Sequence, residues 1–266
     1  MIIVKVGGES LKFFEQYIVQ DIKELVKQDK IILVHGGGDV VTEVARKLGK
    51  EQKFVVSPEG IKSRYTDEED IKIFTMVMAG LINKDLVRTL IKNGVNAVGL
   101  SGVDSSCIVA ERKKKIIIVD ERGRRVAIEG GYTGKITSIN TQIFNLLVSN
   151  NIVPVVAPIA MGSEGEILNV DADALTQKFA SYFKPSHVVF LTDVEGVFLN
   201  GKLVRSIKLD DVDKILPKIG AGMNRKVLSA RDAVKSGAKM AVISLSGKEN
   251  PILSAIKGES GTVIIQ

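Results

Sequence analysis

Short apolar runs alternate along the chain with segments in which apolar residues recur every three or four positions. Apolar runs occupy residues 2–6 and 31–35, and Phe14, Ile18 and Ile22 recur at helical spacing between them. This order predicts a strand, a helix and a parallel strand joined by a right-handed crossover. Further apolar runs lie at 96–100, 152–158, 187–192, 240–245 and 262–265. The pattern therefore indicates an α/β protein with a mostly parallel sheet.

The second strand stops at Gly36-Gly37-Gly38, and a helical pattern begins at once. Side-chain-free backbone at a helix N-terminus presents free N–H groups to an anion, of which phosphate is the commonest. The alternative is a tight turn between strand and helix, for which one glycine would suffice. We therefore favour a phosphate site at these glycines.

The first strand carries Lys5 near its end and closes with Gly7 and Gly8. An unpaired lysine is costly to bury, so one placed before a glycine bend is well positioned to meet a phosphate. The alternative is an edge lysine whose charged head reaches solvent.

Two common nucleotide-binding motifs do not fit. A dinucleotide-binding fold requires Gly-x-Gly-x-x-Gly after the first strand and an acidic residue at the end of the second, where His35 stands instead. Residues 130–135 resemble a Walker A loop, but Ile136 occupies the position of the magnesium-binding Ser or Thr, and the glycine spacing is short.

The bulk composition limits the possibilities further. The 266 residues suit one large domain or two closely joined lobes, and Cys107, the only cysteine, excludes disulfides within the chain and cysteine-based zinc sites. No long apolar run or charged-then-apolar leader is present, so we expect a soluble, cytoplasmic protein that does not bind membranes. The net charge of +6 is dispersed and only 5% of residues are aromatic, which argues against nucleic acid binding.

Polar residues gather at several expected helix starts. Thr66 is expected to cap a helix that runs to Asn93-Gly94 with a possible bend at Gly80, and Arg64 lies in the loop of residues 57–66 before it. A guanidinium can clamp a carboxylate with two hydrogen bonds, although a single loop arginine is usually only solvated. Asn169, Asp171 and Asp173 stand before and at the start of another helix, and three such groups exceed what a cap needs.

Residues 115–119 and 125–128 flank a turn and predict a β-hairpin, which begins with the basic cluster at residues 112–115. Edge lysines discourage strand-to-strand aggregation, so a solvated edge is the default interpretation of this cluster. A last glycine loop at 220–222 leads Lys226 into a helix.

Taken in order, the polar and glycine motifs are specific. The motifs are Val4-Lys5-Val6-Gly7-Gly8, His35-Gly36-Gly37-Gly38, Arg64-Tyr65-Thr66, Asn169-Val170-Asp171-Ala172-Asp173, Thr192-Asp193-Val194-Glu195-Gly196-Val197 and Gly222-Met223-x-x-Lys226. They resemble the amino acid kinase family from end to end. Within it they resemble the N-acetylglutamate kinase branch, and most closely the kinases acting on aminoadipate or glutamate attached to the carrier protein LysW.

The resemblance implies an αβα sandwich around a mostly parallel, roughly eight-stranded sheet. It further implies one amino acid kinase domain over residues 1–266, with an acceptor-binding lobe at 1–160 and an ATP-binding lobe at 161–266. Lys5 and Lys226 would straddle the transferring phosphoryl group, and Asp173 would hold both lysines. ATP would bring Mg²⁺ with it, and the protein would have no metal site of its own.

The remaining site residues follow from the same resemblance. The substrate would be held by Gly36, Gly37, Gly38, Arg64 and Asn169. The nucleotide would be held by Gly7, Gly8, Thr192, Asp193, Gly222 and Met223.

The resemblance also implies partners. Carriers of the LysW type are small and acidic, and Lys62, Lys135 and residues 112–115 could form a basic docking face, with simple solubility as the equal alternative. A homodimer is expected. Free N-acetylglutamate as the acceptor and a non-catalytic amino-acid-sensing subunit stay open as alternatives. A kinase for uridylate, carbamate or isopentenyl phosphate is disfavoured by Arg64 and Asn169, which match carboxylate and amide recognition.

Overall fold

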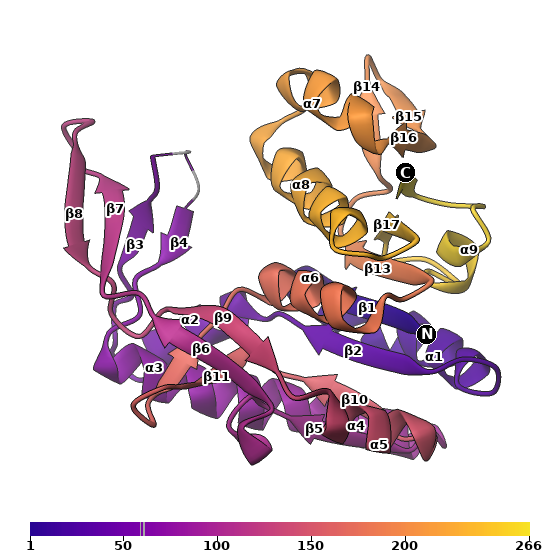
Figure 1. Cartoon of the computed structure of the whole chain (residues 1–266), viewed down its shortest axis with the longest axis horizontal. Coiled ribbons are helices and arrows are strands. Elements are labelled where there is room, and N and C mark those ends of the chain that lie inside the picture. Colours follow the sequence, from indigo (N-terminus) through magenta and orange to yellow (C-terminus); the bar gives the residue numbers. More distant parts are fainter. Residues whose placement is uncertain (59, 61) are drawn as a thin grey trace.

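The centre of the molecule is an eight-stranded sheet, seen in a computed structural model that describes residues 1–58, 60 and 62–266 (Figure 1). Every neighbouring pair is parallel except β17 with β18. The sheet order is β16 (Ser206–Lys208), β18 (Thr262–Ile265), β17 (Met240–Leu245), β13 (His187–Thr192), β1 (Ile2–Val6), β2 (Ile31–His35), β10 (Val153–Val156) and β5 (Ala97–Leu100). The predicted mostly parallel sheet is confirmed.

Each strand sends alternate side chains into one of two hydrophobic layers. In β1, Ile2, Val4 and Val6 belong to one buried cluster and Ile3 to the other. Because side chains alternate across a strand, a strand apolar at every position must be covered on both faces. Helices supply both covers, so the αβα sandwich is confirmed.

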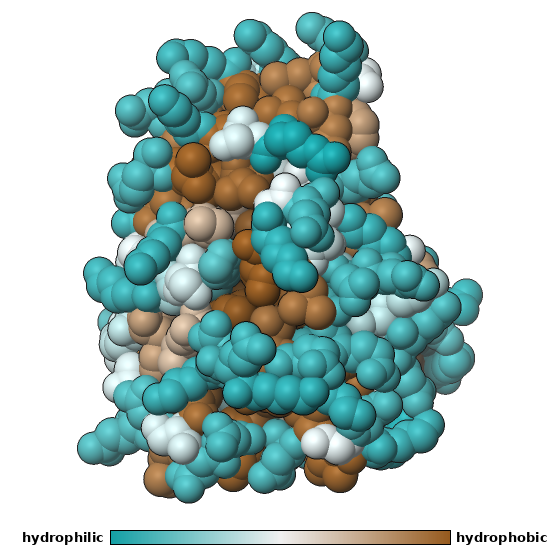
Figure 2. All heavy atoms as spheres, turned by 90° about the vertical axis from the view of Figure 1, so that its right-hand side faces the viewer, coloured by the Kyte–Doolittle hydropathy of each residue, from teal (hydrophilic) through white to brown (hydrophobic). Residues whose placement is uncertain are grey.

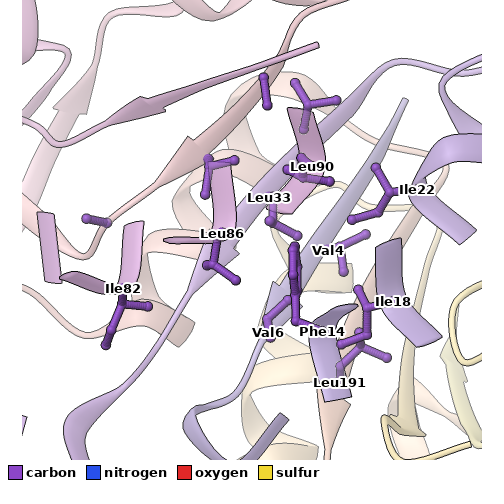
Figure 3. Close-up of a cluster of buried hydrophobic side chains, with 14 of the residues drawn as sticks. Val4, Val6, Phe14, Ile18, Ile22, Leu33, Ile82, Leu86, Leu90 and Leu191 are labelled. Carbon is purple, nitrogen blue, oxygen red and sulfur yellow. The ribbon is translucent and has the colours of Figure 1, made fainter. Parts of the chain in front are cut away.

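The first layer, part of which Figure 3 shows, packs Phe14, Ile18 and Leu90 against Val4 and Leu33 of the sheet. Burial of a side chain of this size contributes roughly 1.5–3 kcal/mol. The elements of this layer are η1 (Gly8–Phe13), η2 (Phe14–Ile18), α1 (Val19–Leu25), α2 (Gly38–Lys47), α3 (Glu68–Thr75), η3 (Met76–Ile82), α4 (Asn83–Lys92) and α9 (Leu253–Ile256). The main helices of the second layer are α5 (Thr141–Ser149), α6 (Ala172–Phe183) and α8 (Ala221–Lys235).

The long helix expected from Thr66 to Asn93 is present but starts one residue later. Its cap is Asp67, whose carboxylate accepts hydrogen bonds from the N–H groups of Glu69 and Asp70, while the Asp70 carboxylate accepts one from the Asp67 N–H. Thr66 with Glu69 three residues on also matches the capping-box pattern, but the Thr66 hydroxyl accepts a hydrogen bond from Asn169 instead, and Asp67 with Asp70 forms the box. The expected cap Thr66 is wrong; the expected irregularity at Gly80 appears as the π-helical segment η3.

Two smaller sheets extend from the half of the molecule that contains β2 and α2 (Figure 1). One consists of β12 (Ile167–Asn169), β11 (Ile159–Gly162), β6 (Ile108–Arg112) and β9 (Gly134–Ile139). The other, which we call the arm sheet, consists of β4 (Lys62–Arg64), β3 (Phe54–Val56), β7 (Lys115–Val119) and β8 (Arg125–Glu129). The β7–β8 pair confirms the predicted hairpin.

Residues 62–64, expected to be loop, form β4 because they pair with β3. Residues 59 and 61 of the expected 57–66 loop lie outside the described residues. A turn at Asn200-Gly201 joins β14 (Val197–Leu199) to β15 (Lys202–Val204). The short helices η4 (Asp104–Ser106), η5 (Leu209–Asp211), α7 (Val212–Ile215) and η6 (Leu216–Lys218) complete the described elements.

Polar side chains cover much of the face on the side of α9 and the C-terminus (Figure 2). Apolar side chains reach the surface in its upper half, over the C-terminal part of the chain. Within the described ranges, no helix has the length and apolar character needed to cross a membrane.

Candidate active site

The predicted glycine turns meet because neighbouring strands of the central sheet end level. Val6 of β1 pairs in register with His35 of β2 and with Leu191 of β13. The turns after these strands therefore lie at one edge of the sheet, where open α/β sheets hold their ligands. A cavity of about 200 Å³ opens there. Its lining residues are Lys5, Gly7, Gly8, Glu9, Ser10, Asp39, Asp173, Phe190, Leu191, Thr192, Asp193 and Lys226.

The turn after β1 is tightly packed at Gly7 and makes ordinary contacts at Gly8. A Cβ atom on Gly7 would lie 3.1 Å from the Leu191 carbonyl oxygen and 3.9 Å from the Lys5 ammonium. A Cβ on Gly8 would lie 3.5 Å from the backbone nitrogen of Gly37. The two glycine turns thus pack backbone to backbone, which leaves the space above them to a ligand rather than to the protein.

The turn after β2 forms the predicted helix start. Helix α2 begins at Gly38, and its N-cap Gly37 has φ of +142°, a conformation that side chains disfavour. A Cβ on Gly37 would also collide with the Ile82 side chain. Free N–H groups of a ten-residue helix therefore face the neighbourhood of Gly8, which is the geometry of an anion site.

Two ion pairs place the lysines in the cavity. The Lys5 ammonium lies 3.0 Å from Asp173 Oδ1, and both side chains are less than one-fifth exposed. The Lys226 ammonium lies 3.0 Å from Asp193 Oδ1 instead. In this structure Asp173 pairs with Lys5, whereas Lys226 pairs with Asp193, and the role of Asp173 toward both lysines stays a prediction. The Thr192 hydroxyl donates to Asp193 at 2.8 Å, and this bond together with Lys226 lowers the pKa of Asp193.

Arg64 reaches the glycine turn from the arm sheet. Its Nη2 donates to the Gly38 carbonyl at 2.7 Å and to Thr42 Oγ1 at 2.8 Å, and its Nε donates to Gln52 Oε1 at 2.9 Å. The Phe54 and Phe74 rings lie within 6.0 Å of the guanidinium carbon. Burial lowers the pKa of Arg64, against the raising effect of Asp70 and Asp39, but arginine keeps its charge in proteins. Nη1 has no protein acceptor among the described residues and is available to a carboxylate.

Asn169 lies beside this region but does not line the cavity. Its Nδ2 donates to Thr66 Oγ1 at 2.9 Å, and its N–H donates to the Tyr132 carbonyl. Asp171, two residues on, caps α6 through the N–H groups of Asp173 and Ala174. Residues 169–171 therefore link the start of α6 to Thr66, which follows Arg64 closely in the chain.

The other predicted nucleotide residues differ in position. Thr192 and Asp193 line the cavity, whereas Gly222 and Met223 do not. Met223 is half-buried and packs against the second hydrophobic layer. Both residues precede Lys226 on α8, so they place its backbone rather than border the described cavity.

Asp39, Glu9 and Ser10 line the cavity and were not predicted to. Asp39 follows the three glycines directly, and its carboxylate would lie 3.6 Å from a Cβ on Gly8. An acid in the first turn of a helix usually serves only the helix dipole, so the sequence offered no separate signal. Ser10 is fully buried, a property that sequence position alone does not reveal.

His35 connects the site to the core and predicts how stability depends on pH. It is fully buried, and burial lowers its pKa to about 4. A depressed histidine pKa contributes stability above about pH 6.5, which is lost as the pH falls toward 4 because the unfolded chain gains a proton first. Between pH 7 and pH 5 this one group should cost about 2 kcal/mol of unfolding free energy.

Urea unfolding at pH 7 and pH 5 checks this expectation. The variant His35→Asn cannot titrate, so its unfolding free energy should fall about 2 kcal/mol less than that of the wild type over this interval. Equal losses in the two proteins would contradict the buried, neutral imidazole.

In the part of the chain that the structure describes, no three or more His, Cys, Asp or Glu side chains are arranged to hold a metal ion.

Solved structures with related folds include smu.665 of Streptococcus mutans, at TM-score 0.79, 24% identity and coverage of 99% and 98% of the two chains. The N-acetylglutamate synthase of Neisseria gonorrhoeae matches at TM-score 0.82 and 17% identity, over all of this chain and 59% of that one.

Sequence relatives are much closer. A protein of Cenarchaeum symbiosum is 50% identical over 264 residues, covering 99% of each chain. A LysW-aminoadipate/LysW-glutamate kinase of Saccharolobus solfataricus is 42% identical over 265 residues, again covering 99% of each. The model of the amino acid kinase family matches residues 1–244. The chain belongs to the amino acid kinase family.

Proposed function

We propose that this protein transfers the γ-phosphoryl group of ATP to the side-chain carboxylate of aminoadipate or glutamate carried on a LysW-type protein, in lysine and/or arginine biosynthesis. The observation that carries the proposal is the convergence of Lys5, Lys226 and the glycine turns on one cavity, with Arg64 bound to the next turn of backbone. Cations and backbone N–H groups bind phosphate, and a guanidinium binds carboxylate. The relatives named as LysW-aminoadipate/LysW-glutamate kinases support the choice of acceptor.

The chemistry follows from the charges. A carboxylate oxygen attacks the γ-phosphorus in line, the bond to the bridging β,γ-oxygen breaks, and an acyl phosphate and ADP result. No general base is needed because the attacking carboxylate is already ionised. Negative charge gathers on the transferring group, so Lys5 on β1 and Lys226 on α8 would stabilise it from two sides.

The space above the glycine turns fits a polyphosphate. The space above Gly7 and Gly8 is bordered by the Lys5 ammonium, by the Gly37 backbone nitrogen and by the Asp39 carboxylate. Thr192 and Asp193 would lie next to the nucleotide, and Mg²⁺ would arrive with ATP and neutralise its phosphates. Asp173 would keep Lys5 in place through their ion pair. We assign the acceptor to residues 1–160 and ATP to residues 161–266, although position 160/161 falls within β11.

Arg64→Lys tests the carboxylate clamp. A lysine cannot bond the Gly38 carbonyl, Thr42 and Gln52 while still offering two donors to a carboxylate. We expect KM for the acceptor to rise at least tenfold, in line with loss of about 1.4 kcal/mol or more from one charge-assisted contact. KM for ATP should stay unchanged in the same steady-state assay. An unchanged KM for the acceptor would remove Arg64 from the substrate site.

The arm sheet provides the docking surface for an acidic carrier. Residues 53–64 and 111–129, which include its four strands, contain ten Lys and Arg against five Asp and Glu. Arg64, which ends β4, connects this surface to the glycine turn. An acidic partner would be steered to this side of the site by the basic surface.

Charge reversal tests the docking surface. The double variant Lys114→Glu/Lys115→Glu should raise KM for the carrier-bound acceptor at least tenfold at low salt, and the effect should shrink at high salt because ions screen exposed charges. The matched control Lys235→Glu/Lys239→Glu changes two exposed lysines outside the arm sheet and should leave KM unchanged. Equal effects of the two double variants would show that total charge, not this surface, matters.

The proposed assembly is a homodimer. Met76, Leu81 and Ile91 on η3 and α4 are each more than half exposed, and this outer helical face lies next to the edge strand β5. A second copy of the chain would cover these apolar side chains, and light scattering with Leu81→Lys/Ile91→Lys would show whether the dimer depends on them.

Because the reaction consumes ATP and an intermediate of amino acid biosynthesis, we place it in the cytoplasm.

A further inference from the structure

The buried His35 side chain holds the peptide between Gly36 and Gly37 in one orientation. His35 Nδ1 lies 2.9 Å from the Gly36 carbonyl oxygen, within the core. A carbonyl oxygen accepts hydrogen bonds, so Nδ1 must carry the proton. In a trans peptide the C=O and N–H groups point in opposite directions, and the described chain contains no cis peptide. The Gly37 N–H therefore points away from the core.

The Gly37 N–H faces the candidate active site. Its nitrogen lies 3.5 Å from the position that a Cβ on Gly8 would take, and Gly8 lines the cavity. Among the described residues the Gly37 N–H has no hydrogen-bond acceptor. A backbone donor without an acceptor beside a cavity is available to an anionic ligand.

A second hydrogen bond fixes the form of the imidazole. Asn83 Nδ2 lies 3.2 Å from His35 Nε2 and also donates to the Val155 carbonyl at 2.9 Å. The bond to a carbonyl identifies this Asn83 atom as the amide nitrogen, so His35 Nε2 must accept. The lowered pKa of His35 agrees with a neutral ring that holds its proton at Nδ1. Among the described residues, the charged group hydrogen-bonded to this assembly is Lys84, whose ammonium lies 3.3 Å from Asn83 Oδ1.

Glycine makes such an anchor necessary. Gly37 has φ of +142°, and neither Gly36 nor Gly37 has a Cβ that would restrict rotation of the peptide between them. Without a bond to its carbonyl, this peptide could turn its N–H away from the cavity at little cost.

We propose that His35 is a positioning residue that holds the Gly36 carbonyl in the core and thereby aims the Gly37 N–H at an oxygen of the transferring phosphoryl group. This inference rests on the proposed function, which supplies the phosphoryl group. His35 itself touches no substrate. Its effect on turnover passes through the peptide that it orients.

Two substitutions of opposite geometry test the proposal. The amide nitrogen of asparagine in His35→Asn stands near the original Nδ1 and can still donate to the Gly36 carbonyl. The longer side chain in His35→Gln places its amide nitrogen near the original Nε2 and loses that bond. We expect kcat within about fivefold of wild type for His35→Asn and at least tenfold lower for His35→Gln, given that one lost oxyanion donor costs about a hundredfold or more.

The controls separate positioning from folding. His187→Gln changes the other histidine of the chain, half-buried at the start of β13, and should leave kcat unchanged. Urea unfolding of every variant at pH 7.5 gives the folded fraction by which kcat is corrected. Equal corrected kcat values for His35→Asn and His35→Gln would overturn the proposal.

A measurement on the wild-type protein requires no variant to fold. Long-range nitrogen–proton NMR correlations report which ring nitrogen of each histidine carries the proton, and only two histidines are present. The proposal requires the proton of His35 at Nδ1, and a proton at Nε2 would overturn it. Failure of the wild type to form an acyl phosphate would instead reject the proposed function while leaving this tautomer result intact.

Discussion

Replacing Lys226 with alanine is expected to lower kcat at least a hundredfold while the protein still folds. Lys226 lines the cavity together with the Lys5–Asp173 pair, and its ammonium lies 3.0 Å from Asp193. Loss of one group that stabilises charge in the transition state costs roughly 2–4 kcal/mol. The partner Asp193 side chain is about half exposed, so removal of Lys226 leaves no buried unpaired charge. Steady-state kinetics with saturating MgATP and acceptor measure the loss.

The matched control lies on the same helix. Lys235 is the last residue of α8, is exposed, and does not line the cavity. Lys235→Ala should keep wild-type kcat. If Lys226→Ala also kept normal turnover, the assignment of this lysine to the transferring phosphoryl group would be wrong.

Replacing Lys5 with methionine is expected to have a still larger effect, about a thousandfold or more in kcat. Lys5 lies on the central strand β1, and its ion pair with Asp173 is mostly buried. Methionine keeps the length of the side chain but removes the charge that would meet the phosphoryl group. It also leaves the Asp173 carboxylate without its cation, and an uncompensated charge of this kind costs several kcal/mol.

The two effects of this substitution can be separated. In the double variant Lys5→Met/Asp173→Asn no charge is left unpaired, so the thermal midpoint should return toward that of the wild type while kcat stays low. Calorimetry and kinetics on the same samples make the comparison. Recovery of kcat in the double variant would show that Lys5 serves only to neutralise Asp173.

Periodicity and glycine turns predicted the parts of the structure that depend on local sequence. Apart from Lys5 and His35, the β1 and β2 strands are apolar because helices cover both faces, and their parallel register carries Gly7 and Gly36 to one edge. Once the strands are parallel, the proximity of these turns follows from geometry alone. The meeting of Lys5 and Asp173, 168 positions apart, also needed the resemblance to a known family.

Contacts decided by side-chain competition could not be predicted in the same way. Asp173 and Asp193 both lie at the cavity, and only the three-dimensional arrangement shows that Lys226 pairs with Asp193. Thr66 is an acceptable cap, but Asp67 with Asp70 forms a better one, which frees Thr66 to bind Asn169. Residues 62–64 carry no strand pattern and become β4 through pairing with β3. In each case a partner distant in sequence, or a stronger neighbour, settled the outcome.

The central claim is that a carboxylate receives the phosphoryl group and that a carrier protein presents it. Hydroxylamine converts an acyl phosphate into a hydroxamate, which can be measured directly. Purified protein and MgATP would be offered free N-acetylglutamate, LysW with a terminal glutamate, or LysW with a terminal aminoadipate. Hydroxamate formed only with LysW is the predicted result, and it would also report which chain length is accepted. Hydroxamate with free N-acetylglutamate would contradict the carrier-bound acceptor, and no hydroxamate with any of the three would contradict phosphoryl transfer to these carboxylates.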